Sequence, residues 1–213
     1  MCKLLQKELR LAAHPTLYIF MCMGALLLIP AYPYGVVFFF SMIGVFQSTM
    51  YARETRDIYY SALLPIRKRD VVKSKLLVTV FAQLGQLLLS LPFAFLRTLY
   101  LPEGNPVGIE ANVAYYGFGL MIFGVFNFVF YTQFFKTAYK AGAALLTALV
   151  PTVLMILAME AAVHFPGLGW LDGLDRASLL RQLPVLGVGA LVYVGGTVLA
   201  YRIGAARFQR VDL

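Results

Sequence analysis

The sequence predicts an all-α membrane protein with six transmembrane helices and both termini on the cytoplasmic side. Of its 213 residues 61% are hydrophobic and only 13% are charged, and the mean hydropathy of +0.77 is far above that of a water-soluble protein. Apolar runs of roughly 17 residues or more recur along the chain. These runs are continuous and do not alternate, which favours helices over a closed barrel, the other structure that spans a bilayer.

The first expected element is an amphipathic helix over residues 3–14. Its basic side chains recur every three or four positions and so share one face: Lys3, Lys7, Arg10 and His14. Such a helix lies along the inner membrane surface, with its basic face toward anionic lipid headgroups. The alternative is a charged overhang that only precedes the first span.

Six apolar stretches follow in a single transmembrane domain. The first two are short for a ~30 Å hydrocarbon core, so one of them is expected to be interrupted or drawn in at its ends. Pro92 is expected to kink or close the third. Loops follow at 101–112 and 165–182, the second with a short surface helix around 176–180. The expected spans cover residues 16–30, 34–50, 76–95, 113–134, 141–164 and 184–201.

The net charge of +8 follows from membrane topology, and its placement does not indicate a nucleic-acid partner. With both termini, residues 53–75 and residues 136–140 on one side, that side holds fifteen of the eighteen Lys and Arg residues. Cytoplasmic loops carry the excess of basic residues. We therefore expect a multi-pass protein of the bacterial cell (inner) membrane with cytoplasmic termini. The basic residues left on the opposite side are Arg97, Arg176 and Arg181.

The largest polar segment, residues 53–75, lies between the second and third spans. Residues 53–64 are expected to form a helix of about three turns that Pro65 ends, and a second helix starts near Arg67. Anionic lipid attracts each basic residue near the surface by ~1 kcal/mol, which explains the basic residues without any further role. The basic residues expected at the membrane surface are Lys3, Lys7, Arg10, Arg67, Lys68, Arg69, Lys73 and Lys75.

The part of this segment before Pro65 is apolar and aromatic although it lies outside the bilayer. Exposed groups of this kind mark a contact surface, and Tyr is a common interface anchor. Alternatively they fold back onto the membrane interface, where Tyr is also frequent. The residues alone do not decide between the two interpretations. The side chains in question are Ile58, Tyr59, Tyr60, Leu63 and Leu64.

The run from Leu64 to Lys75, LPIRKRDVVKSK, resembles the pattern L-P-[VI]-x-[RK]-x-[DE]-[IV]-V-x-[SA]-K. This pattern follows the second span in permease subunits of type-2 ABC exporters, particularly the group that includes the phenol-soluble-modulin exporters. Arg67 stands where Ser is commoner in that group. The segment Leu5 to Arg10, LQKELR, is similar to the K-E-[LIF] opening of the same family.

The resemblance implies a homodimer or heterodimer of six-span subunits, formed with a second permease copy or a paralogue. Each subunit would bind a separate cytoplasmic ABC ATPase, which holds the ATP and Mg, and would export amphipathic peptide or another hydrophobic cargo. The chain carries no G-x-x-x-x-G-K-[ST] phosphate loop, so we expect a non-catalytic subunit without a cofactor of its own. The expected ATPase-coupling residues are Arg53, Glu54, Arg56, Asp57, Tyr59, Tyr60, Leu63, Leu64 and Pro65.

Four neutral polar side chains fall at or near membrane depth. In one interpretation they line a path for an amphipathic substrate. In the other they hydrogen-bond across helices, for ~0.6 kcal/mol on average. Separately, no metal site is expected, because the spacing of the two cysteines matches no known pattern of metal ligands. The candidate pathway residues are Gln47, Gln83, Gln86 and Asn127.

Two features of the last spans also allow two interpretations each. Glu160 and His164 share a helical face near the outer end of the fifth span. They could form an ion or proton site within the membrane, or they could be a solvated pair at its boundary. The last span carries a small-residue face whose partner, in its own subunit or in another, the sequence does not identify. This face consists of Gly196, Ala200 and Gly204.

Two rival functions fit less of the sequence. An intramembrane enzyme needs a nucleophile and base, or metal ligands, that converge within the spans, and the sequence offers no such cluster. A membrane-embedded substrate-binding subunit or scaffold without ATP-coupled gating explains the hydrophobicity equally well. It does not explain the aromatic residues before Pro65 or the motif around it.

Overall fold

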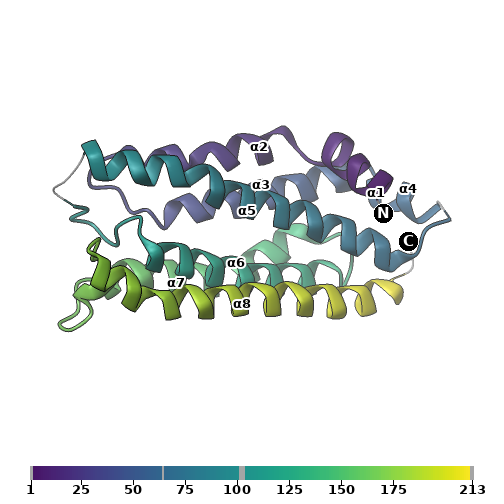
Figure 1. The fold of residues 1–213 in the computed structure, drawn as a ribbon. Helices are drawn as coiled ribbons and strands as arrows, with labels where there is room; N and C mark the ends of the chain where they lie inside the picture. The colour runs from purple at the N-terminus through teal and green to yellow at the C-terminus, as the bar shows by residue number, and fades with distance from the viewer. Residues whose placement is uncertain (1, 64, 101–103, 212–213) are drawn as a thin grey trace.

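The computed structural model describes residues 2–63, 65–100 and 104–211, and every regular element in these residues is a helix (Figure 1). Short helices of unusual winding alternate with long ones: η1 is a π-helix, and η2 and η3 are 3-10 helices. The elements are α1 (Cys2–Lys7), η1 (Glu8–Ala12), α2 (Pro15–Met21), η2 (Cys22–Leu28), α3 (Val36–Glu54), α4 (Asp57–Leu63), α5 (Lys68–Tyr100), α6 (Val113–Phe134), α7 (Ala141–Ala162), η3 (Gly169–Leu171) and α8 (Arg176–Gln209).

Among the described residues, five helices are long and apolar enough to cross a membrane: α3, α5, α6, α7 and α8. A sixth span results if the bent pair Lys3–Ala12 and Pro15–Leu28, which meet at 92°, counts as one. Within the first expected span the helix changes its winding at Cys22, where α2 passes without a gap into the 3-10 helix η2. Near this change the Gln86 side-chain amide donates to the Phe20 carbonyl at 3.0 Å and to the Val37 carbonyl of α3 at 2.8 Å, so α5 contacts both helices here.

Side-chain caps fix where several helices begin. The Asn112 side chain accepts a hydrogen bond from the Tyr115 amide at 3.1 Å and starts α6 at the residue expected for the fourth span. Asp175 caps α8 through the Ser178 amide in the same way. Pro15 is the first residue of α2, where its missing N–H costs no hydrogen bond.

Two helices are longer than the sequence predicted. We expected Pro92 to kink or close the third span, but α5 continues through it to Tyr100. The short surface helix expected around residues 176–180 is the first part of α8, which passes through Pro184 without ending. A proline inside a membrane helix removes only one backbone hydrogen bond, and neighbouring helices compensate for it. The positions of Pro92 and Pro184 therefore do not predict where α5 ends and α8 begins.

The bundle has two layers, with α2, α3 and α5 on one side and α6, α7 and α8 on the other (Figure 1). Within the second layer α6 and α8 approach so closely that a Cβ atom on Gly124 would lie 2.6 Å from the Val192 carbonyl oxygen. Gly196 packs against the Gly124 backbone from the opposite side. The small-residue face of the last span therefore contacts helices of its own subunit.

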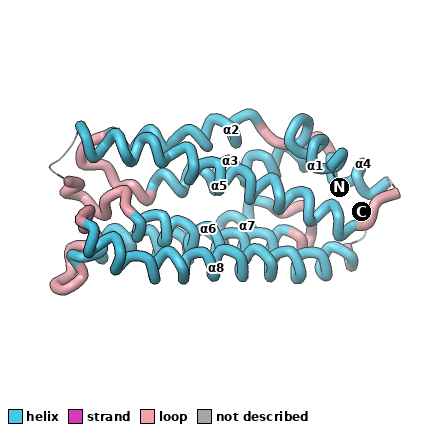
Figure 2. Tube along the Cα trace, in the orientation of Figure 1, coloured by secondary structure: helices cyan, strands magenta, loops and turns pink. Residues whose placement is uncertain are grey.

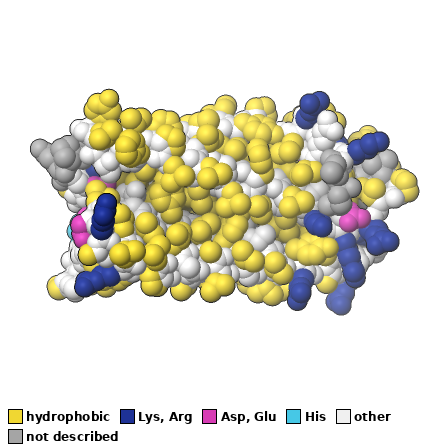
Figure 3. Space-filling view, in the orientation of Figure 1, with side chains coloured by type: hydrophobic (Ala, Val, Ile, Leu, Met, Phe, Trp, Pro, Cys, Tyr) yellow, Lys and Arg dark blue, Asp and Glu magenta, His cyan; other side chains and the backbone are white. Residues whose placement is uncertain are grey.

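Both termini lie at the same end of the bundle, together with α4 (Figure 1). Loops gather at the two ends of the bundle, and helices fill the middle (Figure 2). Hydrophobic side chains cover the middle of the visible face, whereas Lys and Arg gather toward the ends, most densely at the terminal end (Figure 3). This distribution suits a protein that crosses a bilayer along its long axis.

Candidate functional site

The predicted coupling segment does not form one helix. The chain leaves α3 after Glu54, and Thr55 caps that end by bonding the Tyr51 carbonyl with its backbone amide and its hydroxyl, both at 2.9 Å. Arg56 has a φ of +53°, in the left-handed region, which redirects the chain before α4 begins at Asp57. The helix expected over residues 53–64 is therefore wrong, because α3 absorbs its first residues and Arg56 separates them from α4.

The short helix α4 has one face on the bundle and one in the open. Ile58 and Ser61 are buried on the inner face. The side chains of Tyr59, Tyr60 and Leu63 are exposed by 45%, 62% and 66%. Pro65, just beyond α4, is also exposed. Leu64, the remaining apolar member of the predicted contact, lies outside the described residues. The aromatic residues of α4 thus form an outward-facing apolar surface at the terminal end of the bundle.

A cluster of four acidic and basic side chains connects α4 to the neighbouring helices. The Lys75 ammonium lies 3.1 Å from a Glu8 carboxylate oxygen and 3.0 Å from one of Asp57. Lys7 lies 2.5 Å from the other Asp57 oxygen and 3.1 Å from Glu8, and it donates to the Ser61 hydroxyl at 2.8 Å. We call these four residues, Lys7, Glu8, Asp57 and Lys75, the ion cluster. It joins α1 and η1, α4 and α5, and its charges balance.

The ion cluster is largely withdrawn from water. Glu8 is 3% exposed and Lys75 is 9% exposed. Burial alone would raise the pKa of the Asp57 carboxyl, but Lys75 and Lys7 outweigh it and hold that pKa below its ordinary value. Asp57 is therefore ionised at neutral pH, and it accepts from the two lysines with both of its oxygens.

This placement corrects part of the expected membrane-surface set. Lys75 is buried in the ion cluster, and Lys7 also bonds within it, so neither is free to face lipid headgroups. Lys68 is half-buried and donates to the Val211 carbonyl at 2.8 Å. The exposed members of the set are Lys3, Arg10, Arg67, Arg69 and Lys73. Their contact with lipid stays a prediction.

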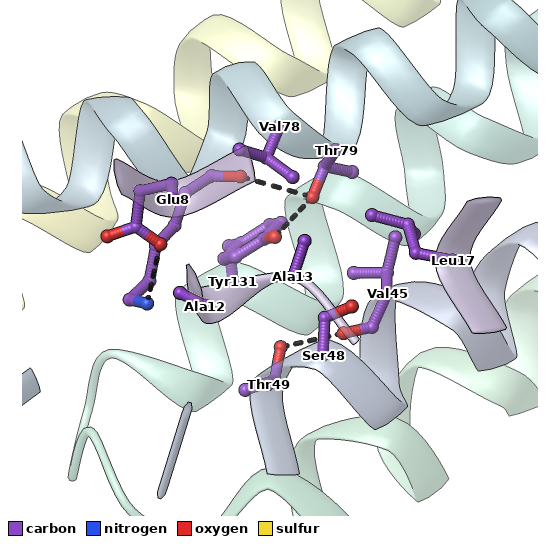
Figure 4. Close-up of a pocket in the computed structure, with 11 residues that line it drawn as sticks. Glu8, Ala12, Ala13, Leu17, Val45, Ser48, Thr49, Val78, Thr79 and Tyr131 are labelled. Carbon is purple, nitrogen blue, oxygen red and sulfur yellow. Dashed lines mark hydrogen bonds and ion pairs between the residues drawn. The ribbon is translucent and has the colours of Figure 1, made fainter. Parts of the chain in front are cut away.

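A small cavity of about 30 Å³ adjoins the ion cluster (Figure 4). Glu8 and Lys75 line one part of it, and the Tyr131 and Thr79 hydroxyls, which are hydrogen-bonded to each other, line another. A space of this size with several polar partners suits about one water molecule. The ion cluster therefore has a polar neighbour deeper in the bundle, toward the middle of α5.

A groove of about 270 Å³ opens next to the exposed face of α4, between the α3–α4 break and the turn that joins α6 to α7. Arg53 lies over the Tyr139 ring at 5.2 Å and forms part of its wall. Arg56 and Tyr59 line the groove as well. Glu54 is exposed at the end of α3. Three of the predicted coupling residues, Arg53, Arg56 and Tyr59, thus line one recess at the terminal end, although they do not share one helix.

The predicted pathway residues bridge helices. Gln83 and Asn127 exchange two amide hydrogen bonds of 2.9 Å between α5 and α6. From α8, the Tyr193 hydroxyl donates to the Gln83 carbonyl oxygen at 3.1 Å, and Thr197 accepts from Asn127 at 3.1 Å. Gln86 donates to carbonyl groups of α2 and α3, and Gln47 accepts from Thr16 on α2. This geometry is that of the structural alternative, and a role in transport stays a prediction.

Gln83 and Gln86 belong to a longer row of polar and charged residues on the inner face of α5. Its members recur at three-, four- and seven-residue intervals and are all at most 9% exposed. Helical spacing places them in one line from the terminal end of the bundle to the opposite end. The line was not recognised in the sequence, where the apolar residues between its members dominate. The row consists of Lys75, Thr79, Gln83, Gln86, Ser90 and Arg97.

At the opposite end, Glu160 binds two loops. Its carboxylate accepts from the Gly35 amide at 2.5 Å and from the Ile109 amide at 3.2 Å, and the residue is 9% exposed. His164 bonds the Val107 carbonyl at 3.1 Å instead of facing Glu160 in solvent. Glu160 is therefore not solvated, as the boundary-pair interpretation expected, whereas His164 is exposed. The sequence also gave no sign of the buried pair in which Arg97 donates to both Glu110 oxygens at 2.9 Å.

Comparison with known proteins gives a family. Residues 3–199 match the model of a family described as ABC-2 family transporter protein. Neither the curated proteins nor the solved structures gave a match. Because the family match covers nearly the whole chain, and because five helices, or six with the bent pair, are suited to span a membrane, the chain belongs to the ABC-2 transporter family and is a transmembrane permease subunit.

Proposed function

We propose that this chain is the membrane subunit of an ATP-driven exporter and that α4 is its coupling helix. A separate cytoplasmic ABC ATPase, which holds the ATP and Mg, docks on the exposed face formed by Tyr59, Tyr60 and Leu63. The observation that carries the proposal is this face itself. Three large apolar side chains stand out of a short helix at the terminal end, and exposed apolar groups of this kind mark a contact surface.

The ion cluster provides the mechanical link. If α4 moved by itself, Asp57 would separate from Lys7 and Lys75, and breaking a buried ion pair costs about 3–5 kcal/mol. The lower-energy response is for α4, α1 and the start of α5 to move together. Since α5 runs from Lys68 to Tyr100, a push on α4 reaches the opposite end of the bundle through one continuous helix.

The remaining parts of the proposal rest on the resemblance to the phenol-soluble-modulin exporter group. Two copies, or one copy and a paralogue, form the translocation path for an amphipathic peptide or another hydrophobic cargo. The termini lie in the cytoplasm of a bacterial cell, and the spans cross its inner membrane. The positions of α4 and both termini at one end of the bundle, together with most of the visible basic residues, support this orientation (Figure 3).

Co-purification with a candidate ABC ATPase tests the docking face. The variant Tyr60→Glu/Leu63→Glu places two charges on the exposed face of α4, where burial against a partner would be costly. We expect it to lose the complex and the stimulated ATP hydrolysis. The control Leu99→Glu/Tyr100→Glu changes two side chains of similar exposure, 61% and 75%, at the other end of the bundle. If the complex and its ATP hydrolysis survive in both variants, the assigned contact is wrong.

A further inference from the structure

A second cleft, separate from the coupling site, opens between the start of α5 and the end of α8. Its volume is about 230 Å³, and it is lined by Arg69, Tyr201, Arg202, Ala205 and Ala206. The two alanines leave the space open, because neither extends beyond its Cβ atom.

Close packing fixes the two walls of this cleft. A Cβ atom on Gly204 would lie 3.6 Å from a methyl group of Val72, which is an ordinary contact. One turn earlier on α5, the Lys68 ammonium lies 5.7 Å from the Phe208 ring and bonds the Val211 carbonyl at 2.8 Å. The two arginines are therefore carried on helices that are held against each other, and the cleft is preformed.

Within the described residues, no acidic side chain compensates the charge in the cleft. Arg69 and Arg202 are both exposed, and neither forms an ion pair with an acidic side chain in the described part of the chain. The deeper Lys75 and Arg97, by contrast, each have carboxylate partners. Guanidinium groups present several donors in a plane and match the oxygens of a phosphate group. Two of them beside one open cleft favour an anionic phosphate ligand.

The surroundings distinguish a lipid phosphate from a dissolved one. Directly inward from the cleft, Val198 and Leu199 on α8 are 43% and 48% exposed, and Leu77 on α5 is 36% exposed. The cleft thus lies between exposed basic residues, Arg69 and Arg202, and exposed apolar residues farther along the same two helices. A soluble anion gains nothing from apolar side chains next to its site, whereas a phospholipid places its acyl chains there.

We propose that the cleft between α5 and α8 binds the phosphate headgroup of an anionic phospholipid through Arg69 and Arg202. Its acyl chains lie along Leu77 and Val198. The bound headgroup offsets the repulsion between the two guanidinium groups and ties the start of α5 to the end of α8. This site is independent of the ATPase contact, because none of its residues belongs to α4 or to the ion cluster.

Native mass spectrometry of the purified protein with added phosphatidylglycerol or phosphatidylcholine tests the proposal. We expect Arg69→Gln/Arg202→Gln to retain about tenfold less phosphatidylglycerol than the unchanged protein. The matched control is Arg67→Gln/Arg210→Gln, which removes two exposed charges outside the cleft, one just before α5 and one just after α8. It should stay within about twofold of the unchanged protein, and phosphatidylcholine should bind weakly throughout.

Thermal unfolding separates binding from folding. Without lipid, both double variants should unfold at the temperature of the unchanged protein. Phosphatidylglycerol should then raise that temperature for the unchanged protein and the control, but not for Arg69→Gln/Arg202→Gln. Equal loss of lipid in the two double variants would show diffuse attraction and would overturn the site. Inorganic phosphate that fully displaces the lipid would assign the cleft to a soluble anion and would overturn the proposal as well.

Discussion

Replacing Lys75 by methionine leaves Glu8 and Asp57 buried with Lys7 as their only cation. Lys75 contacts the two carboxylates at 3.1 and 3.0 Å, so its loss removes half of the positive charge from a cluster that is balanced. An uncompensated buried charge costs about 3–5 kcal/mol. Methionine has a similar length and leaves little cavity, so the electrostatic loss dominates. Because a small polar cavity adjoins the cluster, we expect the lower end, about 3 kcal/mol.

Reversible unfolding in mixed micelles, driven by an increasing fraction of a denaturing detergent, measures this free energy. Lys73→Met is the control, since Lys73 is exposed on the same helix, and its cost should stay within about 0.5 kcal/mol. The double variant Glu8→Gln/Lys75→Met restores a balanced cluster, so its cost should be clearly less than the sum of the single costs. Equal costs for Lys75→Met and Lys73→Met, or strict additivity in the double variant, would refute this reasoning.

Three further predictions follow from contacts elsewhere. In the same unfolding assay, Gly124→Ala should cost about 1–3 kcal/mol, because its methyl group meets the Val192 backbone. The control Gly195→Ala has open space around it and should cost little. Equal costs for the two variants would contradict the close packing of α6 on α8. Asn127→Leu should cost about 1–2 kcal/mol of stability, and adding Gln83→Leu should cost little more, because the hydrogen bonds between the two amides are already lost. Fully additive costs of the two substitutions would show that this amide pair contributes nothing. The lowered pKa of Asp57 means that its contribution to stability is fully present above its ordinary pKa of about 3.9 and is lost as the pH falls below it. Asp57→Asn should flatten that part of the stability profile, and an unchanged acid slope would contradict the pKa shift.

The sequence predicted the features that depend on local pattern. Continuous apolar runs predicted a helical bundle with six spans, and the described residues contain five helices suited to span a membrane, or six with the bent pair. The basic segments predicted that the termini and residues 53–75 share one end, where the termini and α4 lie. The expected bounds of the fourth span coincide with those of α6, and in the structure the Asn112 side chain caps its first turn.

The ion cluster could not be predicted in this way. Glu8, Asp57 and Lys75 are separated by many residues, and helical periodicity does not say which acid meets which base. The positive-inside rule accounts for Lys75 as a basic residue at the cytoplasmic membrane surface, and it gives no reason to expect that Lys75 is buried. The sequence signal is weak: Glu8 is the one acid among the basic residues at positions 3–10, whereas Asp57 shares residues 53–75 with Glu54 and Asp70.

The α3–α4 break was also missed, since Arg56 adopts a left-handed conformation that glycine or asparagine would have indicated. The sequence suggests His164 as the partner of Glu160, whereas the hydrogen-bond partners of Glu160 in the structure are backbone amides of two distant loops. In both cases tertiary contacts decide the local structure.

Photo-cross-linking in cells tests the central claim most directly. A photoreactive amino acid is placed at Tyr60, on the exposed face of α4, in cells that also express the candidate ABC ATPase. The same substitution at Tyr100, at the far end of α5, provides the comparison. We predict a covalent adduct with the ATPase from position 60 and none from position 100. An adduct from position 100, or none from position 60 when both proteins are present, would contradict the assignment of α4 as the coupling helix.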